Sequence, residues 1–461
     1  MTGHAFRNVF AMRFDDWCGS RVAVLGLGVE GRCAVQWLAR HCACRSITAF
    51  TDAADYSQVA GVEKVCEPVT AEMLNGYDWV IKSPGFSPYR DPVAGALADG
   101  ARVTSVSRMW FATHPDAKFV CITGSKGKST TAALLAHLLR HAGIDCALGG
   151  NIGVPLLDLP DAAVYVLELS SYQCADLDLH PDLCCVLNLF PEHLDWHGNL
   201  ARYYRDKLNL ILARGAGTAV LPDVCEQPAR GFVQQAARAT QDVRWLKQHS
   251  CDDLTLHGGQ LCRDGQGILD LANFPLPGRH NQRNLLVALV LARELGVDPQ
   301  PAVAALQSFH GLPHRCQVLG EQDGIRYVDD SIATTPHASI AALDALGDLA
   351  RTVIIVGGHD RGINWDVFAR YVREHAPRAV LTLPENGPSI AALLAQEAPG
   401  LAVVSCPELA SAVAAGQRIL AGEGTLLLSP GAPSFTAYTD FAARGLHFAA
   451  LAGIGGHGEQ H

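Results

Sequence analysis

Short runs of apolar residues alternate along this chain with longer stretches in which apolar positions recur every three or four residues. The short runs are typical of strands that are buried on both faces of a sheet, and the longer stretches predict helices. Arg21–Leu25 is one such run, and a predicted helix follows it over residues 32–41. Because strands and helices that alternate in this order form parallel sheets, we expect the α/β fold class.

The same alternation continues through the chain in three blocks. Further strands are predicted over residues 78–82, 119–123, 164–169, 184–189, 325–328, 352–356, 379–383, 401–405 and 425–428. A helix is expected over residues 281–295, whereas the weak pattern of residues 222–266 predicts short strands and turns. Gly311-Leu312-Pro313 is typical of a hinge. We therefore predict domains over residues 1–112, 113–311 and 312–461.

The composition is that of a large globular protein without a basic face. The chain has 461 residues, of which 49% are hydrophobic and 18% charged, and its net charge is −10. This charge argues against binding to nucleic acid or to a membrane surface. No apolar run approaches ~20 residues, and the N-terminus lacks the apolar core of a signal peptide. The 15 cysteines are scattered without a CxxC pair, which favours free thiols in a reducing cytosol. We expect a cytoplasmic monomer.

One glycine-rich loop carries the strongest chemical signal. The predicted strand that ends at Thr123 runs into Gly124-Ser125-Lys126-Gly127-Lys128-Ser129-Thr130, and a helix is predicted directly after it. Backbone N–H groups of such a loop close around phosphate oxygens, and the helix N-terminus adds positive potential. Lys128 can reach the β and γ phosphates of ATP, and the Ser129 hydroxyl can coordinate Mg²⁺. A standard P-loop would have glycine where Ile122 stands, so a glycine-rich turn without a ligand stays an alternative.

A second glycine pattern, Gly26-x-Gly28-x-x-Gly31, follows the first predicted strand. It is the fingerprint of a dinucleotide-binding loop, and Asp52 lies near the right distance downstream to contact a ribose. Taken alone, this pattern favours an NAD-dependent oxidoreductase. The same loop also serves other diphosphates, including a UDP-sugar, so both kinds of ligand stay open.

Polar residues also follow two strands of the central block. Glu168 and Ser170 lie at the end of one predicted strand, and residues 188–195 place His193 among carboxylates after the next. Because ligands bind at the carboxyl ends of parallel strands, we expect these side chains beside the glycine-rich loop. Carboxylates hold Mg²⁺ while the ion keeps several waters. Lys207 lies in a helical pattern over residues 203–212, where a lysine is by default a surface residue.

Together, these motifs resemble the Mur ligase family, and within it the MurD branch, which adds glutamate to UDP-N-acetylmuramoyl-L-alanine in peptidoglycan synthesis. The resemblance covers nearly the whole chain. The matching segments are residues 26–28, 83–85, 123–130, 149–153, 168–173, 188–195, 280–284, 311–315, 330–331, 357–358 and 428–435.

The resemblance implies a three-domain architecture and a set of roles at the reaction centre. The three domains would be a Rossmann-like N-terminal domain for the UDP-linked substrate, a P-loop-type central ATPase domain and a Rossmann-like C-terminal domain for glutamate. Lys128 would hold ATP phosphates, Ser129 and Glu168 would hold one Mg²⁺ ion, and His193 would help to bind a second. Lys207 matches the lysine that CO₂ carbamylates in this family, which makes it an anionic metal ligand.

The resemblance also implies contacts to each substrate. ATP would be bound by Gly124, Ser125, Lys126, Gly127, Lys128, Ser129, Thr130, Asn281, Asn284, Arg315 and Asp330. The UDP-linked substrate would be bound by Gly28, Asp52, Ser83, Pro84, Gly85, Asn151, Ser170 and Gln173. Glutamate would be bound by Thr334, Arg361, Ser434 and Phe441. The implied reaction converts the alanyl carboxylate to an acyl phosphate with ATP, and the amine of glutamate then displaces phosphate.

Two segments of the last block depart from the usual MurD pattern. Ile332 stands where a lysine is usual, and residues 429–438 read SPGAPSFTAY in place of SPACASFDQF. In the phosphate loop, Lys126 replaces a usual asparagine. Because the first two changes lie beside the implied glutamate pocket, we expect L-glutamate as the substrate, as in a branch of the family with similar loops. The standard reaction with D-glutamate stays the alternative.

Two other classes of protein explain less of the sequence. An NAD-dependent oxidoreductase built on the first glycine pattern leaves the loop around Lys128 without a role. A non-catalytic ATP-binding regulator leaves Glu168, His193 and Lys207 without one.

Overall fold

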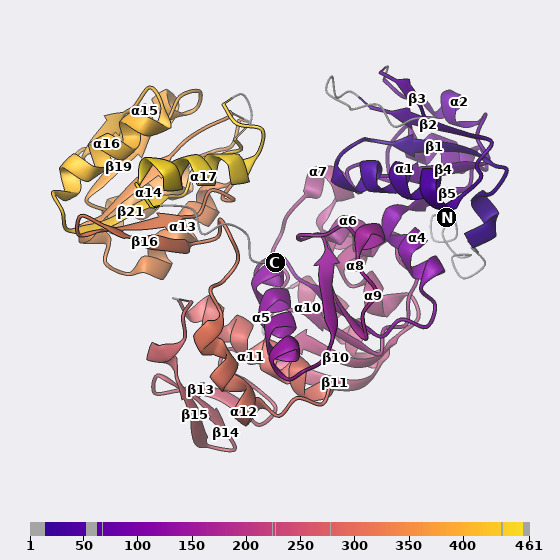
Figure 1. Cartoon of the computed structure of the whole chain (residues 1–461), viewed down its shortest axis with the longest axis horizontal. Coiled ribbons are helices and arrows are strands. Elements are labelled where there is room, and N and C mark those ends of the chain that lie inside the picture. Colours follow the sequence, from indigo (N-terminus) through magenta and orange to yellow (C-terminus); the bar gives the residue numbers. More distant parts are fainter. Residues whose placement is uncertain are drawn as a thin grey trace. The chain divides into compact units, whose positions relative to one another are not determined.

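The structure of the chain, a computed structural model, consists of two compact units. It describes residues 14–51, 62–66, 68–223, 225, 227–276, 278–360, 362–434 and 437–454. The first unit comprises the described residues up to Phe274 together with His280–Phe309, and the second comprises Pro275–Arg279 and the described residues from His310 onward. The second unit is orange to yellow in Figure 1.

The first unit begins with a five-stranded parallel sheet in the order β3-β2-β1-β4-β5. Side chains alternate between its two faces, so Val22 and Val24 enter one apolar cluster with α1 and α4, and Ala23 and Leu25 enter another with α2 and α3. Both faces are covered, which is why the first strand is an uninterrupted apolar run. The elements are η2 (Phe14–Trp17), β1 (Arg21–Leu25), α1 (Val29–His41), β2 (Ser46–Phe50), β3 (Val62–Val65), α2 (Ala71–Leu74), β4 (Trp79–Lys82), α3 (Val93–Ala98), β5 (Val103–Ser105) and α4 (Val106–Thr113).

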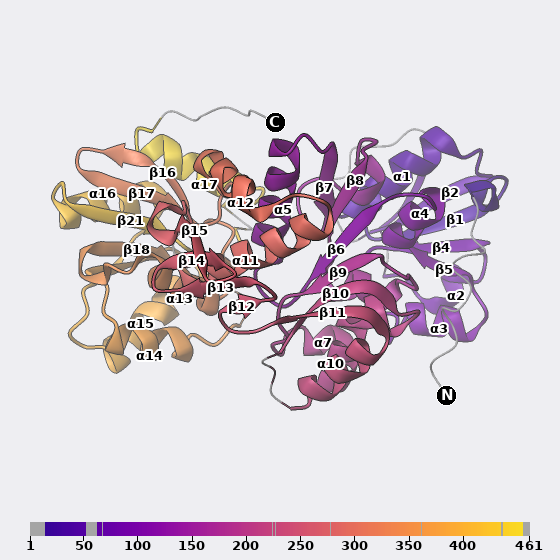
Figure 2. The same cartoon turned by 90° about the horizontal axis from the view of Figure 1, so that it is seen from below.

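The central sheet has six parallel strands in the order β11-β10-β9-β6-β8-β7. Figure 2 shows β6, β9 and β10 side by side. Since β6 lies between β8 and β9, the loops after these three strands emerge together at one edge. The strands are β6 (Phe119–Thr123), β7 (Cys146–Gly150), β8 (Val164–Glu168), β9 (Leu183–Val186), β10 (Ala216–Pro222) and β11 (Thr240–Leu246). The helices are α5 (Lys128–His141), η3 (Leu156–Asp158), α6 (Ser171–Asp176), α7 (Leu194–His197), α8 (Leu200–Lys207), α9 (Asn209–Leu212), α10 (Ala229–Arg238), α11 (Arg279–Glu294), α12 (Pro299–Ala302) and η5 (Val303–Ser308).

A small antiparallel sheet follows the central one, and it corrects part of the sequence prediction. Its strands are β12 (Ser250–Cys251), β13 (Leu254–His257), β14 (Gln260–Arg263) and β15 (Gln266–Asp270), and η4 (Leu271–Asn273) comes next. Short strands in residues 222–266 are thus confirmed, but the prediction is wrong in omitting α10. That helix was missed because its apolar stripe is narrow: its buried residues are Ala229, Val233 and Ala236.

The second unit is a six-stranded sheet in the order β16-β17-β21-β18-β19-β20, parallel except for β16. Helices α13, α14 and α15 pack on one face, and α16 and α17 pack on the other. The strands are β16 (Gln317–Gln322), β17 (Ile325–Asp329), β18 (Thr352–Val356), β19 (Ala379–Thr382), β20 (Val403–Ser405) and β21 (Gly424–Leu428). The helices are α13 (Pro336–Leu346), η6 (Leu349–Arg351), α14 (Asp366–Glu374), α15 (Gly387–Glu397), α16 (Leu409–Leu420) and α17 (Phe441–Leu451).

The α/β fold class is therefore confirmed, and the three-domain division at residues 112 and 311 stays a prediction. The helix expected over residues 203–212 is in fact two helices, α8 and α9, which break at Leu208. The structure describes all of the cysteines, and none of them forms a disulfide. Over the described parts of the chain, no helix combines the length and apolar character needed to cross a membrane.

Candidate active site

The glycine-rich loop after β6 has a backbone conformation that side chains disfavour. Gly124 has a φ of +149° and Gly127 a φ of +86°. A Cβ added at Gly127 would lie 2.5 Å from Asn284 Oδ1 on α11, and one added at Gly124 would lie 2.9 Å from Leu187 Cβ. The loop thus fits closely between the segment after β9 and α11, and it leads directly into the N-terminus of α5. This is the geometry of a phosphate-binding loop.

Neighbouring side chains brace this loop. Ser125 is buried, and its Oγ lies 2.7 Å from Tyr203 Oη and donates to Phe190 O at 3.0 Å. The backbone N–H of Lys126 donates to Asn188 Oδ1 at 2.8 Å. The side chain of Ser125 thus supports the loop, and a contact from this residue to a phosphate would come from its backbone.

Two lysines converge on the backbone of the loop. Lys128 Nζ donates to Ser125 O at 3.1 Å, and Lys207 Nζ donates to Gly124 O at 2.8 Å. Lys207 is 2% exposed, so the default expectation of a surface lysine is wrong. Burial, and after it the charge of Lys128, lowers the pKa of Lys207 to about 7. A large share of this amine is therefore neutral near pH 7, and the neutral amine is the nucleophilic form.

Glu168 lies at the end of β8, paired in register with Ile122 of β6 and Gly150 of β7. Its side chain is buried, and Oε1 accepts a hydrogen bond from Asn151 Nδ2 at 3.0 Å. Its Oε2 is buried and has no hydrogen-bond partner. An unpartnered buried carboxylate oxygen is costly unless a cation completes its environment.

These residues fit a partly hydrated Mg²⁺ ion. Ser129, in the first turn of α5, and Glu168 supply the hydroxyl and carboxylate oxygens that Mg²⁺ prefers. No group of three or more His, Cys, Asp and Glu side chains that could hold a metal occurs within the described ranges. The described side chains therefore supply only some of the ligands of a Mg²⁺ ion. Mg²⁺ commonly keeps waters and phosphate oxygens as its other ligands.

His193 begins α7 as its N-cap residue, with a φ of +54°. Its ring lies 5.0 Å from the ring of Tyr172. Partial burial lowers the pKa of His193, and Lys207 acts in the same direction while Glu192 opposes it. The neutral imidazole that binds metals is therefore favoured. Whether His193 binds a metal stays a prediction.

The loop after β1 has the close packing that its glycines predict. A Cβ at Gly31 would lie 1.8 Å from Gly26 O, so a larger residue does not fit there. Ser83, directly after β4, donates from Oγ to Gly26 O at 2.9 Å. Gly28 is exposed at the N-cap of α1. The predicted diphosphate loop and the segment that starts at Ser83 are thus neighbours at one edge of the first sheet.

Three more predicted contacts to the UDP-linked substrate, Asn151, Ser170 and Gln173, follow strands β7 and β8 of the central sheet. Ser170 and Gln173 form a capping box at the start of α6. Gln173 Nε2 also donates to Glu30 Oε1 at 2.7 Å, which connects α6 to α1. Asn151 lies beside Glu168 through the hydrogen bond described above. Their contacts to a substrate stay predictions.

Glu30 is an unusual carboxylate, because burial raises its pKa to about 7 while Lys82 and the hydrogen bond from Gln173 oppose that shift. The unfolded value is 4.5, so the folded state binds more protons between the two values. The contribution of Glu30 to the free energy of unfolding therefore falls as the pH rises from 4.5 to about 7.

Replacing Glu30 by glutamine should remove this pH dependence. We expect E30Q to match the native protein near pH 5 and to be more stable by about 1–2 kcal/mol near pH 8. Urea unfolding of the two proteins across this range measures the difference. A stability gap that stays constant with pH would contradict the assignment.

In the second unit, predicted site residues gather at one edge of the sheet. Asp330 and Thr334 follow β17, and Ser434 follows β21, the adjacent parallel strand. Asp330 is buried and accepts a hydrogen bond from Ser429 Oγ at 2.7 Å. Burial raises the pKa of Asp330 to about 6, although its hydrogen bonds and the charge of Arg315 act against this.

Arg444, on α17, is a residue of this region that sequence reasoning missed. Its guanidinium is buried and donates to Ser331 O at 2.8 Å, Ala432 O at 3.0 Å and Pro433 O at 3.2 Å. It therefore joins the two loops that carry the departures from the usual pattern. Phe441, three residues earlier, starts α17 with its ring 5.9 Å from that of His314. Only the spatial closeness of the loops reveals Arg444, since no motif surrounds it.

The structure brings together most of the predicted site residues of the first unit. The phosphate loop, Asn281, Asn284, Glu168, Asn151 and Lys207 lie at one edge of the central sheet. Two predicted residues, Asp52 and Arg361, lie outside the described residues. Arg315, Asp330, Thr334, Ser434 and Phe441 belong to the second unit.

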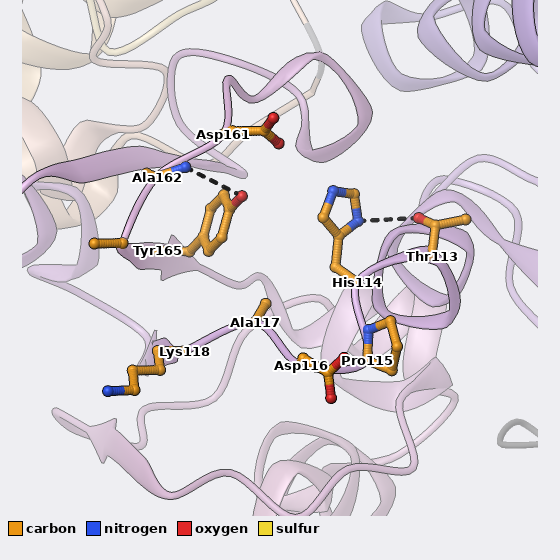
Figure 3. Close-up of a pocket in the computed structure, with 10 residues that line it drawn as sticks. Thr113, His114, Pro115, Asp116, Ala117, Lys118, Asp161, Ala162 and Tyr165 are labelled. Carbon is orange, nitrogen blue, oxygen red and sulfur yellow. Dashed lines mark hydrogen bonds between the residues drawn. The ribbon is translucent and has the colours of Figure 1, made fainter.

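A hollow of about 550 Å³ lies at the other edge of the central sheet, before β6 and β8 (Figure 3). Its wall includes His114, whose Nδ1 lies 3.0 Å from Thr113 Oγ1, and Tyr165, whose Oη accepts from Ala162 N. These polar groups bond within the wall, and the hollow does not contain the predicted site residues.

Comparisons with known proteins found matching families, named relatives and solved structures of similar fold. Residues 122–292 match the family described as the Mur ligase middle domain, and residues 314–432 match the Mur ligase, glutamate ligase domain. A protein of Xanthomonas campestris pv. campestris (strain 8004), named UDP-N-acetylmuramoyl-L-alanine--L-glutamate ligase, is 43% identical over 96% of this chain and 97% of its own length. A protein of the same name from Xylella fastidiosa (strain 9a5c) is 42% identical over the same shares.

Solved structures with lower sequence identity share the fold. UDP-N-acetylmuramate-alanine ligase MurC from Thermotoga maritima superimposes with a TM-score of 0.62 at 19% identity, covering 94% of this chain and 98% of that one. MurF ligase from Thermotoga maritima, in complex with ADP, superimposes with a TM-score of 0.54 at 17% identity, covering 97% and 98%.

Proposed function

The chain belongs to the Mur ligase family, and from this premise we propose that it joins L-glutamate to UDP-N-acetylmuramoyl-L-alanine in peptidoglycan precursor synthesis. Members of this family are ATP-dependent ligases that form amide bonds. The substrates are those that the names of the 42% and 43% identical relatives give. The glycine loop after β1 then serves a UDP-linked substrate, and an NAD-dependent oxidoreductase is no longer needed to explain it.

One observation carries the proposal for the reaction centre. Lys128, Lys207 and the unpartnered carboxylate oxygen of Glu168 surround the same glycine-rich loop at the carboxyl edge of the central sheet. The cation of Lys128, the lysine amine of Lys207 with its lowered pKa and the buried carboxylate of Glu168 suit a site for phosphoryl transfer, in which negative charge moves between oxygens.

The chemistry follows from the reactivity of a carboxylate. A carboxylate resists attack by an amine because it is anionic and has no good leaving group, so ATP first converts it to an acyl phosphate. The amine of glutamate then attacks the acyl carbon, the tetrahedral intermediate collapses, and ADP and phosphate are the other products. Lys128 is placed to neutralise charge on the phosphates, and the buried site limits hydrolysis of the acyl phosphate by water.

Two Mg²⁺ ions are part of the proposal. One would be held by Ser129 and Glu168, and the other by His193 and a carbamylated Lys207; when bound, they would screen the charge of the phosphates. The low pKa of Lys207 and its buried place support carbamylation. The N-terminal domain would bind the UDP-linked substrate, the central domain ATP, and the C-terminal domain glutamate. We also propose that the protein is a cytoplasmic monomer.

The hand of glutamate is tested directly with the two enantiomers. With ATP, Mg²⁺ and UDP-N-acetylmuramoyl-L-alanine, we expect product from L-glutamate and at least about tenfold lower kcat/KM with D-glutamate, since a pocket separates enantiomers by the placement of its polar groups. Chromatography of the UDP-linked product measures both reactions. Efficient product from D-glutamate alone would establish the standard MurD reaction instead.

A further inference from the structure

Residues 84–89, which follow β4, form hydrogen bonds to α7 and to α8, the helix that ends at Lys207. Trp196 Nε1, on α7, donates to Pro84 O at 3.0 Å and to Gly85 O at 3.1 Å. Ser87 Oγ donates to Trp196 O at 2.8 Å. Tyr89 Oη donates to Asp206 Oδ1, on α8, at 2.6 Å. The segment predicted to contact the UDP-linked substrate therefore bonds directly to the residue beside Lys207.

The second carboxylate oxygen of Asp206 also has a partner. Its Oδ2 lies 2.6 Å from His197 Nδ1, and His197 Nε2 lies 3.0 Å from Ser171 Oγ at the start of α6. Asp206, His197 and Ser171 are all buried. Burial, and after it the charge of Asp206, raises the pKa of Tyr89, so the phenol stays a protonated donor at working pH. Both carboxylate oxygens of Asp206 thus have fixed partners.

We propose that Tyr89 and Asp206 are positioning residues that set the place of the Lys207 amine. This inference rests on the proposed function, in which Lys207 is carbamylated and binds a metal. Tyr89 follows β4 of the first sheet, whereas Asp206 lies on α8 beside the central sheet. The hydrogen bond between them therefore makes the position of Lys207 depend on the segment that follows Ser83.

The physical reason lies in where α8 ends. Lys207 is the last residue of α8, and Leu208 separates it from α9, so Lys207 lacks a continuous helix on its C-terminal side. The last turn of a helix frays unless side chains hold it. Asp206 holds this turn through Tyr89 and His197. Without the hydrogen bonds of Asp206 to Tyr89 and His197, Lys207 Nζ would keep its 2.8 Å contact to Gly124 O for less of the time.

The same segment also supports His193. Trp196, which bonds to Pro84 and Gly85, stacks on Tyr172 with ring centroids 4.4 Å apart, and Tyr172 lies 5.0 Å from His193. Residues 84–89 thus reach both side chains that we propose as ligands of the second Mg²⁺ ion. Of these contacts, the Tyr89–Asp206 hydrogen bond is one that the loss of a single oxygen atom removes.

Tyr89→Phe removes only the phenolic oxygen of this bond, and Tyr371→Phe is its matched control. Tyr371 Oη bonds to Asp344 at 2.5 Å, which is the same chemical pair in the other unit. The first readout is the rate at which acetic anhydride acetylates Lys207 in CO₂-free buffer, followed by peptide mass spectrometry with Lys247 as the internal reference. We expect Y89F to raise this rate at least threefold and Y371F to leave it unchanged.

The second readout is the ¹³C carbamate signal of the protein in ¹³C-bicarbonate, together with steady-state kinetics. We expect Y89F to need several-fold more bicarbonate for half-maximal signal and to lower kcat severalfold, with little change in KM for the UDP-linked substrate. Lys207 acetylation equal in Y89F and the native protein would overturn the inference. An equally large rise at Lys82, which is 0% exposed, would also overturn it, because that rise reports general loosening. Since acetylation needs no substrate, absence of ligase activity in the native protein would refute the proposed function separately.

Discussion

Replacing Lys128 by alanine should lower kcat for amide formation by at least about 10³-fold, because the variant loses the cation that we propose next to the transferred phosphoryl group. Lys128 Nζ lies 3.1 Å from Ser125 O at the mouth of the phosphate loop, where a bound triphosphate would replace that contact. Release of ADP that depends on UDP-N-acetylmuramoyl-L-alanine and L-glutamate measures the effect. Thermal unfolding should change little, since Lys128 is half-buried and a single hydrogen bond contributes only about 1 kcal/mol to stability.

Lys126 provides the matched control in the same loop. Its side chain is 59% exposed and pairs with Glu192 at 2.6 Å. An exposed ion pair is worth little, and the backbone N–H of Lys126, which bonds to Asn188, stays in place in K126A. We expect K126A to lose less than about tenfold in kcat. Equal losses in K126A and K128A would mean that the loop needs overall positive charge, and the specific role of Lys128 would then be wrong.

The phosphate loop could be predicted from the sequence because its parts are contiguous. A strand, two glycines, the Lys-Ser pair and a helix follow one another within residues 119–141, and the structure has β6, the loop and α5 in those places. The sheets were predictable for a similar reason, since strands buried on both faces are uninterrupted apolar runs. Helix α10 was not, because two of its three buried residues are alanines, which give a weak apolar signal.

The surroundings of Lys207 could not be predicted from local sequence. Its amine bonds to Gly124, which is 83 positions away, and the neighbouring Asp206 bonds to Tyr89, which is 117 positions away. Burial lowers the pKa of this lysine, and burial follows from how α8 packs rather than from residues 203–212 themselves. The resemblance to a family singled out Lys207, and the structure adds that burial lowers the pKa of this amine.

The predicted pocket for the amino acid has features that neither the local sequence nor the resemblance to a family indicates. The two loops that depart from the usual pattern are joined by Arg444, 113 positions from Ser331, and the sequence does not mark it. The hand of glutamate depends on where polar groups are placed rather than on which groups are present. Sequence therefore predicts that this pocket is altered, and the assay with both enantiomers is what decides the outcome.

Glu168→Gln should abolish most activity and still leave the ligand-free protein at least as stable as the native one. The substitution keeps the acceptor for Asn151 but removes the negative charge from a buried oxygen that has no partner. A neutral amide in that place is less costly than an unpaired carboxylate, so we expect a Tm that is unchanged or higher by about 1–3 °C. Without the carboxylate, Mg²⁺ should bind about 10–100-fold more weakly, and kcat should fall by at least about 10²-fold.

Scanning calorimetry and a Mg²⁺ titration of ADP release separate these two effects, with Glu397→Gln as the control. Glu397 is 43% exposed and pairs with Arg373 at the surface of the second unit, so E397Q should leave both the Mg²⁺ response and kcat unchanged. Mg²⁺ with a non-hydrolysable ATP analogue should raise the Tm of E168Q less than that of the native protein and of E397Q, because a ligand stabilises a fold in proportion to how well it binds. If E168Q lost stability while its Mg²⁺ response stayed native, Glu168 would be a structural residue, and its unpartnered oxygen would not mark the metal site.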